Sequence, residues 1–141
     1  MTLLLDTGAM LALANRSDPQ QRNVERILEH EAGELVLPAP IAAEVDYMLG
    51  RRLGQRARRG FISDLAQGQY QVACLELDDY ETLRRLDEQY EDLNAGLADL
   101  SVVVLARRFR TKRILTFDER DFRALRPLDG GSFVLLPKDE A

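Results

Sequence analysis

The chain begins with a short apolar segment that ends abruptly in polar residues. Residues 3–5 are all leucine, and an apolar run without polar alternation is typical of a strand buried on both faces of a parallel sheet. Asp6, Thr7 and Gly8 follow at once, and the next six residues, Ala-Met-Leu-Ala-Leu-Ala, predict a helix that ends near Asn15. Ligands of open parallel α/β sheets bind beyond the carboxyl ends of the strands. We therefore expect Asp6 to lie at a ligand-binding edge.

The same order of residues recurs near the other end of the chain. An apolar strand ends at Thr116, and Asp118 then precedes a short helix that opens with Glu-Arg-Asp-Phe. Further apolar segments predict strands over residues 35–37, 71–75 and 132–136. Strands that alternate with helices predict an α/β fold, a three-layer sandwich in which a mostly parallel, five-stranded sheet is flanked by helices. Residues 1–141 contain no linker or internal repeat, so we expect a single domain.

The helices between these strands are predicted from capping residues and apolar spacing. Residues 17–19, Ser-Asp-Pro, predict a helix with Pro19 at its first position and an end near Gly33. Pro40 leads into a helix whose buried stripe lies at positions 41, 45, 48 and 49. Another helix is expected over residues 56–67, with Ile62 facing inward. Asp78 and Glu81 form a plausible capping box for a helix that extends to residue 90. The last long helix is expected over residues 97–109, where the length of the apolar segment favours a helix over a strand.

Composition excludes several classes of protein and of site. Hydrophobic residues make up 45% of the chain and charged residues 30%, as in a globular domain, and no apolar run approaches the ~20 residues of a membrane span. Asp6 interrupts the N-terminal apolar segment, which therefore does not resemble a signal peptide, and we expect a cytoplasmic protein. Cys74 and His30 are each the only residue of their type, so cysteine or histidine metal sites lose support. We expect Cys74 to be a small buried residue of a strand, and the chemistry to be carried by carboxylates.

The charge is unevenly distributed along the chain. The net charge is −5, and acids are concentrated between residues 78 and 92. Basic residues form two runs without acids, namely Arg51, Arg52, Arg56, Arg58 and Arg59, and then Arg107, Arg108, Arg110, Lys112 and Arg113. Such a run is either a solvated face or a surface that contacts phosphates, which supplies affinity without sequence information.

Four carboxylates stand out because of their apolar surroundings. Asp6 and Asp118 end buried strands, and Asp99 lies near the start of the most apolar helix, between two leucines. Glu44 borders the apolar stripe of its helix, whereas its neighbour Asp46 is expected to face solvent. A buried carboxylate needs a partner or a metal ion, and no Lys or Arg adjoins these acids in sequence. Mg²⁺ and Mn²⁺ prefer oxygen ligands, so a divalent cation would meet this need.

Each of these residues also has a structural interpretation. Asp6 and Asp118 can cap the helices that they precede, and Glu44 can be an exposed helical residue. Asp121 competes with Asp118 as the ligand, although we interpret Asp121 as a first-turn residue favoured by the helix dipole. Thr7 and the threonine before Asp118 either end their strands as ordinary hydroxyls or help to hold a metal-bound water.

The motifs together resemble the PIN domain, and more narrowly the VapC-type toxins of bacterial type II toxin–antitoxin modules. The resemblance covers nearly the whole chain and is carried by Asp6-Thr7 after the first strand, Glu44 in Ala-Ala-Glu-Val, Asp99 in Gly-Leu-Ala-Asp-Leu, and Thr116-Phe-Asp118-Glu-Arg-Asp-Phe. It implies a PIN-like sandwich and a Mg²⁺- or Mn²⁺-dependent endoribonuclease that cuts transfer or ribosomal RNA and so blocks translation.

The resemblance also implies roles for individual residues. Asp6, Glu44, Asp99 and Asp118 match the family's four acidic positions, and Thr116 matches its usual hydroxyl. Asp6 and Asp99 are the first candidates for direct metal ligands and Asp118 the next, while Glu44 ligates directly or acts through water. The two basic runs, including Arg51, Arg52, Arg56, Arg107, Arg108 and Arg110, would then hold the RNA backbone around the acidic centre.

The partners that the resemblance implies are a second copy of the chain and an antitoxin. Antitoxins of this family commonly present an Arg to the carboxylates, and a guanidinium can pair bidentately with them. Tyr47, Met48 and Leu53, or Phe61 and Ile62, are candidates for either interface, with core packing as the alternative.

Two rival functions remain for a chain with these motifs. A non-catalytic PIN-like RNA- or protein-binding module would keep the fold and the basic runs, but the complete set of four acids argues against it. A phosphatase built on a strand-end aspartate needs a second acid two residues later, where this chain has Gly8.

Overall fold

The computed structural model describes residues 1–140 and forms the predicted α/β sandwich. In chain order the elements are β1 (Leu3–Leu5), α1 (Thr7–Ala14), α2 (Gln21–His30), β2 (Leu35–Pro38), α3 (Ala39–Arg52), α4 (Gln55–Ala66), β3 (Gln71–Ala73), α5 (Leu77–Gln89), the 3₁₀ turn η1 (Glu91–Leu93), α6 (Leu97–Arg108), β4 (Arg113–Leu115), α7 (Glu119–Ala124) and β5 (Val134–Leu136).

The sheet is parallel throughout and has the strand order β3-β2-β1-β4-β5. β1 lies at its centre, where Leu4 pairs with Val36 of β2 on one side and with Ile114 of β4 on the other. All three leucines of β1 have no exposed surface, which explains why this strand shows no polar alternation. The prediction of a mostly parallel, five-stranded sheet is therefore confirmed, with every described pair parallel.

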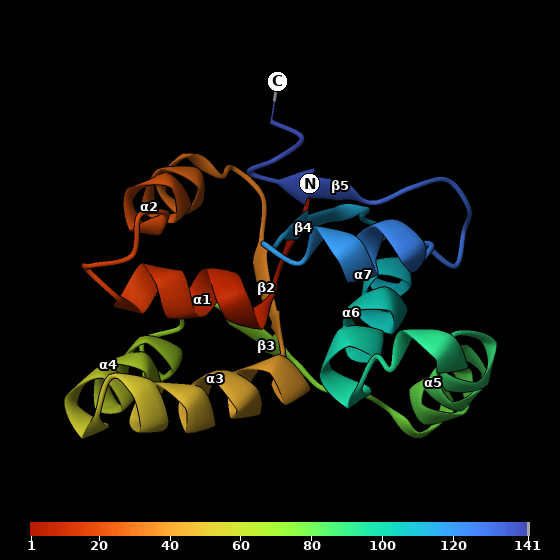
Figure 1. Ribbon diagram of the computed structural model, residues 1–141, viewed down its shortest axis with the longest axis horizontal. Coiled ribbons are helices and arrows are strands. Elements are labelled where there is room, and N and C mark those ends of the chain that lie inside the picture. The colour runs from red at the N-terminus through yellow and green to blue at the C-terminus, as the bar shows by residue number, and fades with distance from the viewer. Residues whose placement is uncertain (141) are drawn as a thin grey trace.

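Helices cover both faces of the sheet and complete the three layers. In Figure 1, α1 to α4 lie on one side of the strands and α5 to α7 on the other. Helix α6 is the most buried of them: residues 100–106 are all buried, so the long apolar segment is a helix, as predicted. Helix α7 is anchored by Phe122, whose ring meets Phe133 edge-to-face with centroids 6.2 Å apart.

Two helices begin at different residues from those predicted. The Asp18 carboxylate accepts the Gln20 backbone N–H at 2.8 Å, which closes a turn, so Pro19 precedes α2 instead of starting it. Helix α2 also ends earlier, at His30. Helix α5 starts at Leu77, and its first turn is stabilised by Asp79, which accepts the Glu76 backbone N–H at 2.7 Å; the predicted box of Asp78 and Glu81 is wrong.

Two side chains that the sequence placed inside are exposed. Strand β3 is an edge strand and ends at Ala73, so Cys74 lies beyond it and is exposed. Ile62 on α4 is 44% exposed, whereas Phe61 beside it is buried. Within residues 1–140, no helix has both the length and the apolar character that crossing a membrane requires.

Candidate metal centre

The candidate site lies between β1 and β4, where the direction in which the chain adds strands to the sheet changes. From β1 the chain proceeds outward to β2 and β3, and it returns to β4 on the other side before it reaches β5. In open α/β sheets the crevice at such a reversal, beyond the carboxyl ends of the strands, binds ligands. Asp6 follows β1 directly and Asp118 follows β4, so both line this crevice, as the sequence predicted, and Thr116 lies buried between them.

A buried hydroxyl links the two strand ends. Thr116, which is 1% exposed, donates a hydrogen bond from its Oγ1 to the Asp6 carboxylate at 2.6 Å. The same oxygen accepts the Asp118 backbone N–H at 2.9 Å. Thr116 therefore fixes the orientation of one carboxylate and the backbone of the next, which is more than an ordinary strand-end hydroxyl does.

Asp118 has a structural role as well as a place at the site. Its carboxylate accepts the Asp121 backbone N–H at 3.1 Å and so caps α7. Asp6 stands at the equivalent position before α1, but its side chain forms no such capping bond within residues 1–140. The capping interpretation is thus correct for Asp118 and incorrect for Asp6.

Asp121 joins the cluster, although we interpreted it from sequence as a first-turn residue. Carboxylate oxygens of Asp99, Asp118 and Asp121 all lie within 4.8 Å of one another, close enough to share one ion. Asp121 does lie in the first turn of α7, where the helix dipole favours an acid. The three-residue spacing from Asp118 was the available signal, because residues three apart at a helix start share a face.

Glu44 reaches the site from α3, but by a different route from the one expected. Its side chain is exposed and lies at the rim of a 510 Å³ hollow that Asp6, Asp99 and Asp118 also line. Asp46, which we expected to face solvent, is the more buried of the two and pairs with Arg58 at 3.1 Å. The prediction that Glu44 is the inward-facing acid is therefore wrong in burial, although the residue does face the other acids across the hollow.

The proximity of these acids raises the pKa values of several carboxyl groups. Burial is the main cause for Asp6, whose pKa lies above its ordinary value despite the hydrogen bond from Thr116, and nearby acids add to the effect. Burial, followed by the charges of Asp6 and Asp118, raises the pKa of Asp99 to about 7. The pKa of Asp121 is also raised, by burial and by Asp118. In the absence of a cation, therefore, the cluster holds its negative charge with difficulty.

The donor set fits a hard divalent cation. Its candidate ligands are all carboxylates, which Mg²⁺ and Mn²⁺ prefer, and the hollow is open enough to admit waters of hydration. The buried Thr7 Oγ1, which lines the same hollow, has no hydrogen-bond partner within residues 1–140. A water held at the centre would supply that partner.

The first basic run adjoins the hollow. Arg52, near the end of α3, lines it together with the carboxylates. Arg51 lies over the ring of Tyr47, with 5.8 Å from its guanidinium carbon to the ring centroid, and Arg56 is exposed at the start of α4. Arg52 therefore provides positive charge at one side of the acidic centre.

The second basic run does not reach the carboxylates. Helix α6 starts at the hollow with Asp99, and Arg107 lies eight residues further along, which is about 12 Å of helix. Strand β4 begins at Arg113, so this residue lies at the opposite, amino-terminal edge of the sheet. Arg113 is held there by Glu31 at 2.6 Å, and Arg108 pairs with Asp79 of α5. The expectation that both runs surround one centre is not met.

Comparison with known proteins identifies the family. The model of the PIN domain matches residues 3–126, a segment that contains all of the acids described above. This chain belongs to the PIN domain family. Ribonuclease VapC26 of Mycobacterium tuberculosis is 36% identical to this PIN domain over 135 residues, an alignment that covers 96% of the chain and 100% of the relative. The VapC-type resemblance of the motifs is thereby confirmed.

Solved structures show the same fold. VapC20 of Mycobacterium tuberculosis, described as a sarcin-ricin loop cleaving toxin, has a TM-score of 0.77 and 18% identity to this PIN domain, and the match covers 84% of this chain and 91% of that one. VapBC2 from Rickettsia felis, bound to a DNA fragment from its promoter, has a TM-score of 0.66 and 17% identity, with 96% and 97% of the two chains covered.

Proposed function

We propose that this PIN domain is a Mg²⁺- or Mn²⁺-dependent endoribonuclease that acts as a VapC-type toxin. The observation that carries the proposal is the convergence of Asp6, Asp99 and Asp118 in one solvent-open hollow at the carboxyl edge of the sheet, with Asp121 close enough to share an ion and Glu44 at the rim. The near full-length relative named as a ribonuclease supports the same activity.

The residues of the centre divide the work of phosphodiester hydrolysis. A bound divalent cation would activate a water and neutralise charge on the phosphate. Asp6 and Asp99 are the proposed direct ligands, with Asp118 next, and Thr116 holds the Asp6 carboxylate in one orientation. Glu44 is well placed to orient a water, because its side chain is exposed and lines the same hollow as Asp6, Asp99 and Asp118.

The phosphates of an RNA substrate are negatively charged and are repelled by the carboxylates of the hollow. Arg52 lines the hollow and offers a cation to a phosphate of the bound RNA, and Arg51 and Arg56 extend that basic surface along α3 and α4. Transfer or ribosomal RNA is the proposed target, and its cleavage would block translation. The structural neighbour that cleaves the sarcin-ricin loop supports a ribosomal target.

The proposed partners are a cognate antitoxin and a second copy of the chain. The proposed location of the protein is the cytoplasm. A hollow lined by carboxylates suits an inhibitor that presents a guanidinium, and the VapBC2 assembly is a structural neighbour. Tyr47, Leu53 and Ile62 are 63%, 38% and 44% exposed and form the candidate apolar contacts, whereas Phe61 belongs to the core.

The test is cleavage of total bacterial RNA by purified, antitoxin-free protein in Mg²⁺ or Mn²⁺, beside Asp99→Asn. Asp87→Asn is the matched control, because Asp87 is an exposed acid on α5. We expect discrete fragments from the wild type and the control, and none from Asp99→Asn or in EDTA. Mapping the fragment ends would identify the target. A folded wild-type protein that binds RNA but cuts none with any metal would instead support the binding module.

A further inference from the structure

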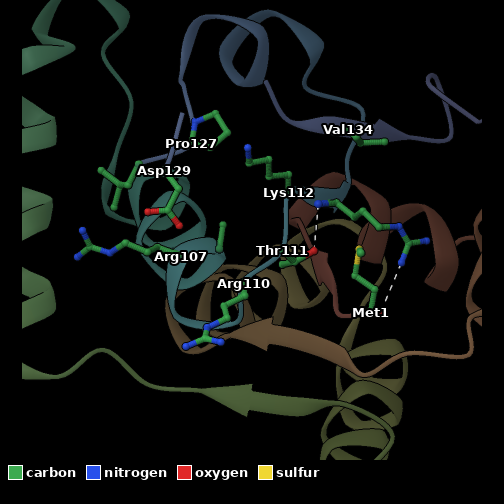
Figure 2. Close-up of a pocket in the computed structure, with 11 residues that line it drawn as sticks. Met1, Arg107, Arg110, Thr111, Lys112, Pro127, Asp129 and Val134 are labelled. Atoms are coloured by element: carbon green, nitrogen blue, oxygen red, sulfur yellow. Dashed lines mark hydrogen bonds between the residues drawn. The ribbon is translucent and has the colours of Figure 1, made fainter. Parts of the chain in front are cut away.

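A second cavity of the described chain lies away from the carboxylates. It has a volume of about 610 Å³, within the range of sites that hold small organic groups, and it lies at the amino-terminal edge of the sheet. The end of α6, the start of β4 and the segment 127–134 line it, as Figure 2 shows. The proposed nuclease activity makes no use of this cavity.

The cavity combines apolar walls with a basic rim. Its walls are formed by Met1, Ala106, Pro127, Leu128 and Val134. Arg107 and Arg110 extend from the end of α6 on one side, and Lys112 extends from the other side toward Pro127. Asp129 is the single acid among the lining residues. An apolar body that carries negative charge suits such a lining.

The rim cations are not committed to the fold. Within residues 1–140, the side chains of Arg107, Arg110 and Lys112 form no ion pair and no hydrogen bond, and all three are exposed. The neighbouring Arg108 and Arg113 behave differently, because each is paired with an acid of another element. Two members of this basic run are thus held in ion pairs, whereas Arg107, Arg110 and Lys112 line the cavity without a partner among the described residues.

The backbone at Arg110 gives a second reason to assign this surface a role. Arg110 directly follows Phe109, the C-cap residue of α6, and has a φ of 52°, in the left-handed region. This is the position that glycine usually occupies at the end of a helix. An arginine there is unfavourable for the backbone, and such strain is commonly retained where the side chain serves a function.

We infer that this cavity is a second subsite for single-stranded RNA, with a nucleobase against its apolar walls and the adjoining phosphates on Arg107, Arg110 and Lys112. The inference rests on the proposed function, which makes RNA the substrate. Bases splayed out of single strands bind against apolar surfaces while cations follow the backbone. Asp129 accepts hydrogen bonds from the amino or hydroxyl groups of a nucleotide, which inorganic phosphate at neutral pH offers poorly.

Helix α6 connects the two RNA surfaces. Asp99 in its first turn lines the acidic hollow, and Arg107 in its last turn lines the cavity, about 12 Å away along the helix axis. A flexible single strand long enough to occupy both surfaces gains affinity from simultaneous contact, whereas a dinucleotide at the carboxylates does not. The cavity therefore favours longer single-stranded substrates.

The test measures, by fluorescence anisotropy, how tightly the full chain binds a labelled single-stranded oligoribonucleotide of about 12 residues in EDTA. The variant is Arg107→Gln/Arg110→Gly/Lys112→Gln, and the charge-matched control is Arg16→Gln/Arg22→Gln/Lys138→Gln, whose residues are exposed cations outside both surfaces. Each phosphate contact to a single strand contributes about 0.7 to the magnitude of the slope of log K against log salt, so three contacts raise the binding constant about 100-fold at 0.1 M salt. We expect the triple variant, but not the control, to bind the RNA about 100-fold more weakly and to show a salt slope smaller in magnitude by about 2.

Two further measurements separate binding from folding and RNA from a simple anion. Arg110→Gly alone should bind RNA about 5-fold more weakly while its thermal stability stays equal or rises. Inorganic phosphate should displace the RNA no more than sodium chloride of equal ionic strength does. Equal affinities of the triple variant and its control, or specific displacement by phosphate, would overturn the inference.

The failure of this inference is distinguishable from the failure of the proposed function. Binding in EDTA requires no cleavage, so a selective loss of affinity in the triple variant supports the subsite even if the protein cuts no RNA. Conversely, metal-dependent cleavage with unaltered binding by the triple variant would retain the nuclease and remove the subsite.

Discussion

Replacing Asp99 with asparagine should stabilise the metal-free protein at pH 8 and change its stability little at pH 4.5. The pKa of this carboxyl group is raised from 3.8 to about 7, chiefly by burial and then by the neighbouring acids. Because the folded state binds the proton more tightly than the unfolded state, stability falls as pH rises from about 4 to about 7 and is constant above that. Asparagine removes the charge and hence the fall.

The size of the effect follows from the pKa difference. About three units at 1.36 kcal/mol each give an upper limit of about 4 kcal/mol. Asp99 is only half-buried and lies beside an open hollow, so solvent screening reduces the expected gain to about 2 kcal/mol. For a domain of this length, that gain corresponds to a rise in Tm of roughly 7 °C at pH 8.

The assay is urea unfolding followed by far-UV circular dichroism in EDTA, since the chain has no tryptophan. Asp87→Asn, on the exposed side of α5, serves as the control and should change stability by no more than about 0.5 kcal/mol at either pH. Added Mg²⁺ should stabilise the wild type more than Asp99→Asn. If Asp99→Asn destabilised the metal-free protein equally at both pH values, the account of a strained acidic cluster would be refuted.

Three further substitutions test the packing around the site. Thr116→Val leaves the buried Asp6 carboxylate without its hydroxyl donor and should lower the free energy of unfolding by about 1–3 kcal/mol, measured as a lower urea midpoint. Arg113→Gln should cost about 1 kcal/mol at pH 7 and progressively less at acidic pH, because Arg113 lowers the pKa of Glu31 and that stability is lost as pH falls through the lowered value; a loss that does not depend on pH would contradict the ion pair's role. Phe122→Ala should cost about 3–5 kcal/mol, and a loss below 1 kcal/mol by thermal unfolding would show that α7 is not anchored by this ring.

The parts of the fold that the sequence predicted are those in which local pattern and tertiary structure agree. Residues 3–5 and 114–115 belong to inner strands of a parallel sheet, where burial on both faces requires apolar side chains. The acids that follow them then lie at one edge because parallel strands end together. Asp6 and Asp118 were predictable for that reason.

The parts that the sequence did not predict depend on contacts between distant segments. Glu44 and Asp46 are two residues apart on one helix, and their burial was reversed because Arg58 of α4 covers Asp46. Cys74 is exposed because β3 is an edge strand, and position in the sheet is not encoded in a five-residue pattern. The run from Arg107 lies at the far edge because α6 crosses the length of the sheet, which depends on topology and not on charge.

The central claim is that the carboxylates of the hollow form a metal centre that hydrolyses RNA. The most direct test is the single-turnover rate of cleavage of one labelled RNA, measured against Mn²⁺ concentration for the wild type, Asp6→Asn and the control Asp87→Asn. Replacing a group that supports a metal ligand typically costs 10- to 100-fold, so loss of a ligand itself should lower the rate by at least about 100-fold. The account predicts that the cleavage rate of Asp6→Asn falls by at least this factor, whereas the rates of the control and of the wild type saturate at the same Mn²⁺ concentration. Cleavage by Asp6→Asn at the wild-type rate and with the wild-type Mn²⁺ dependence would contradict it.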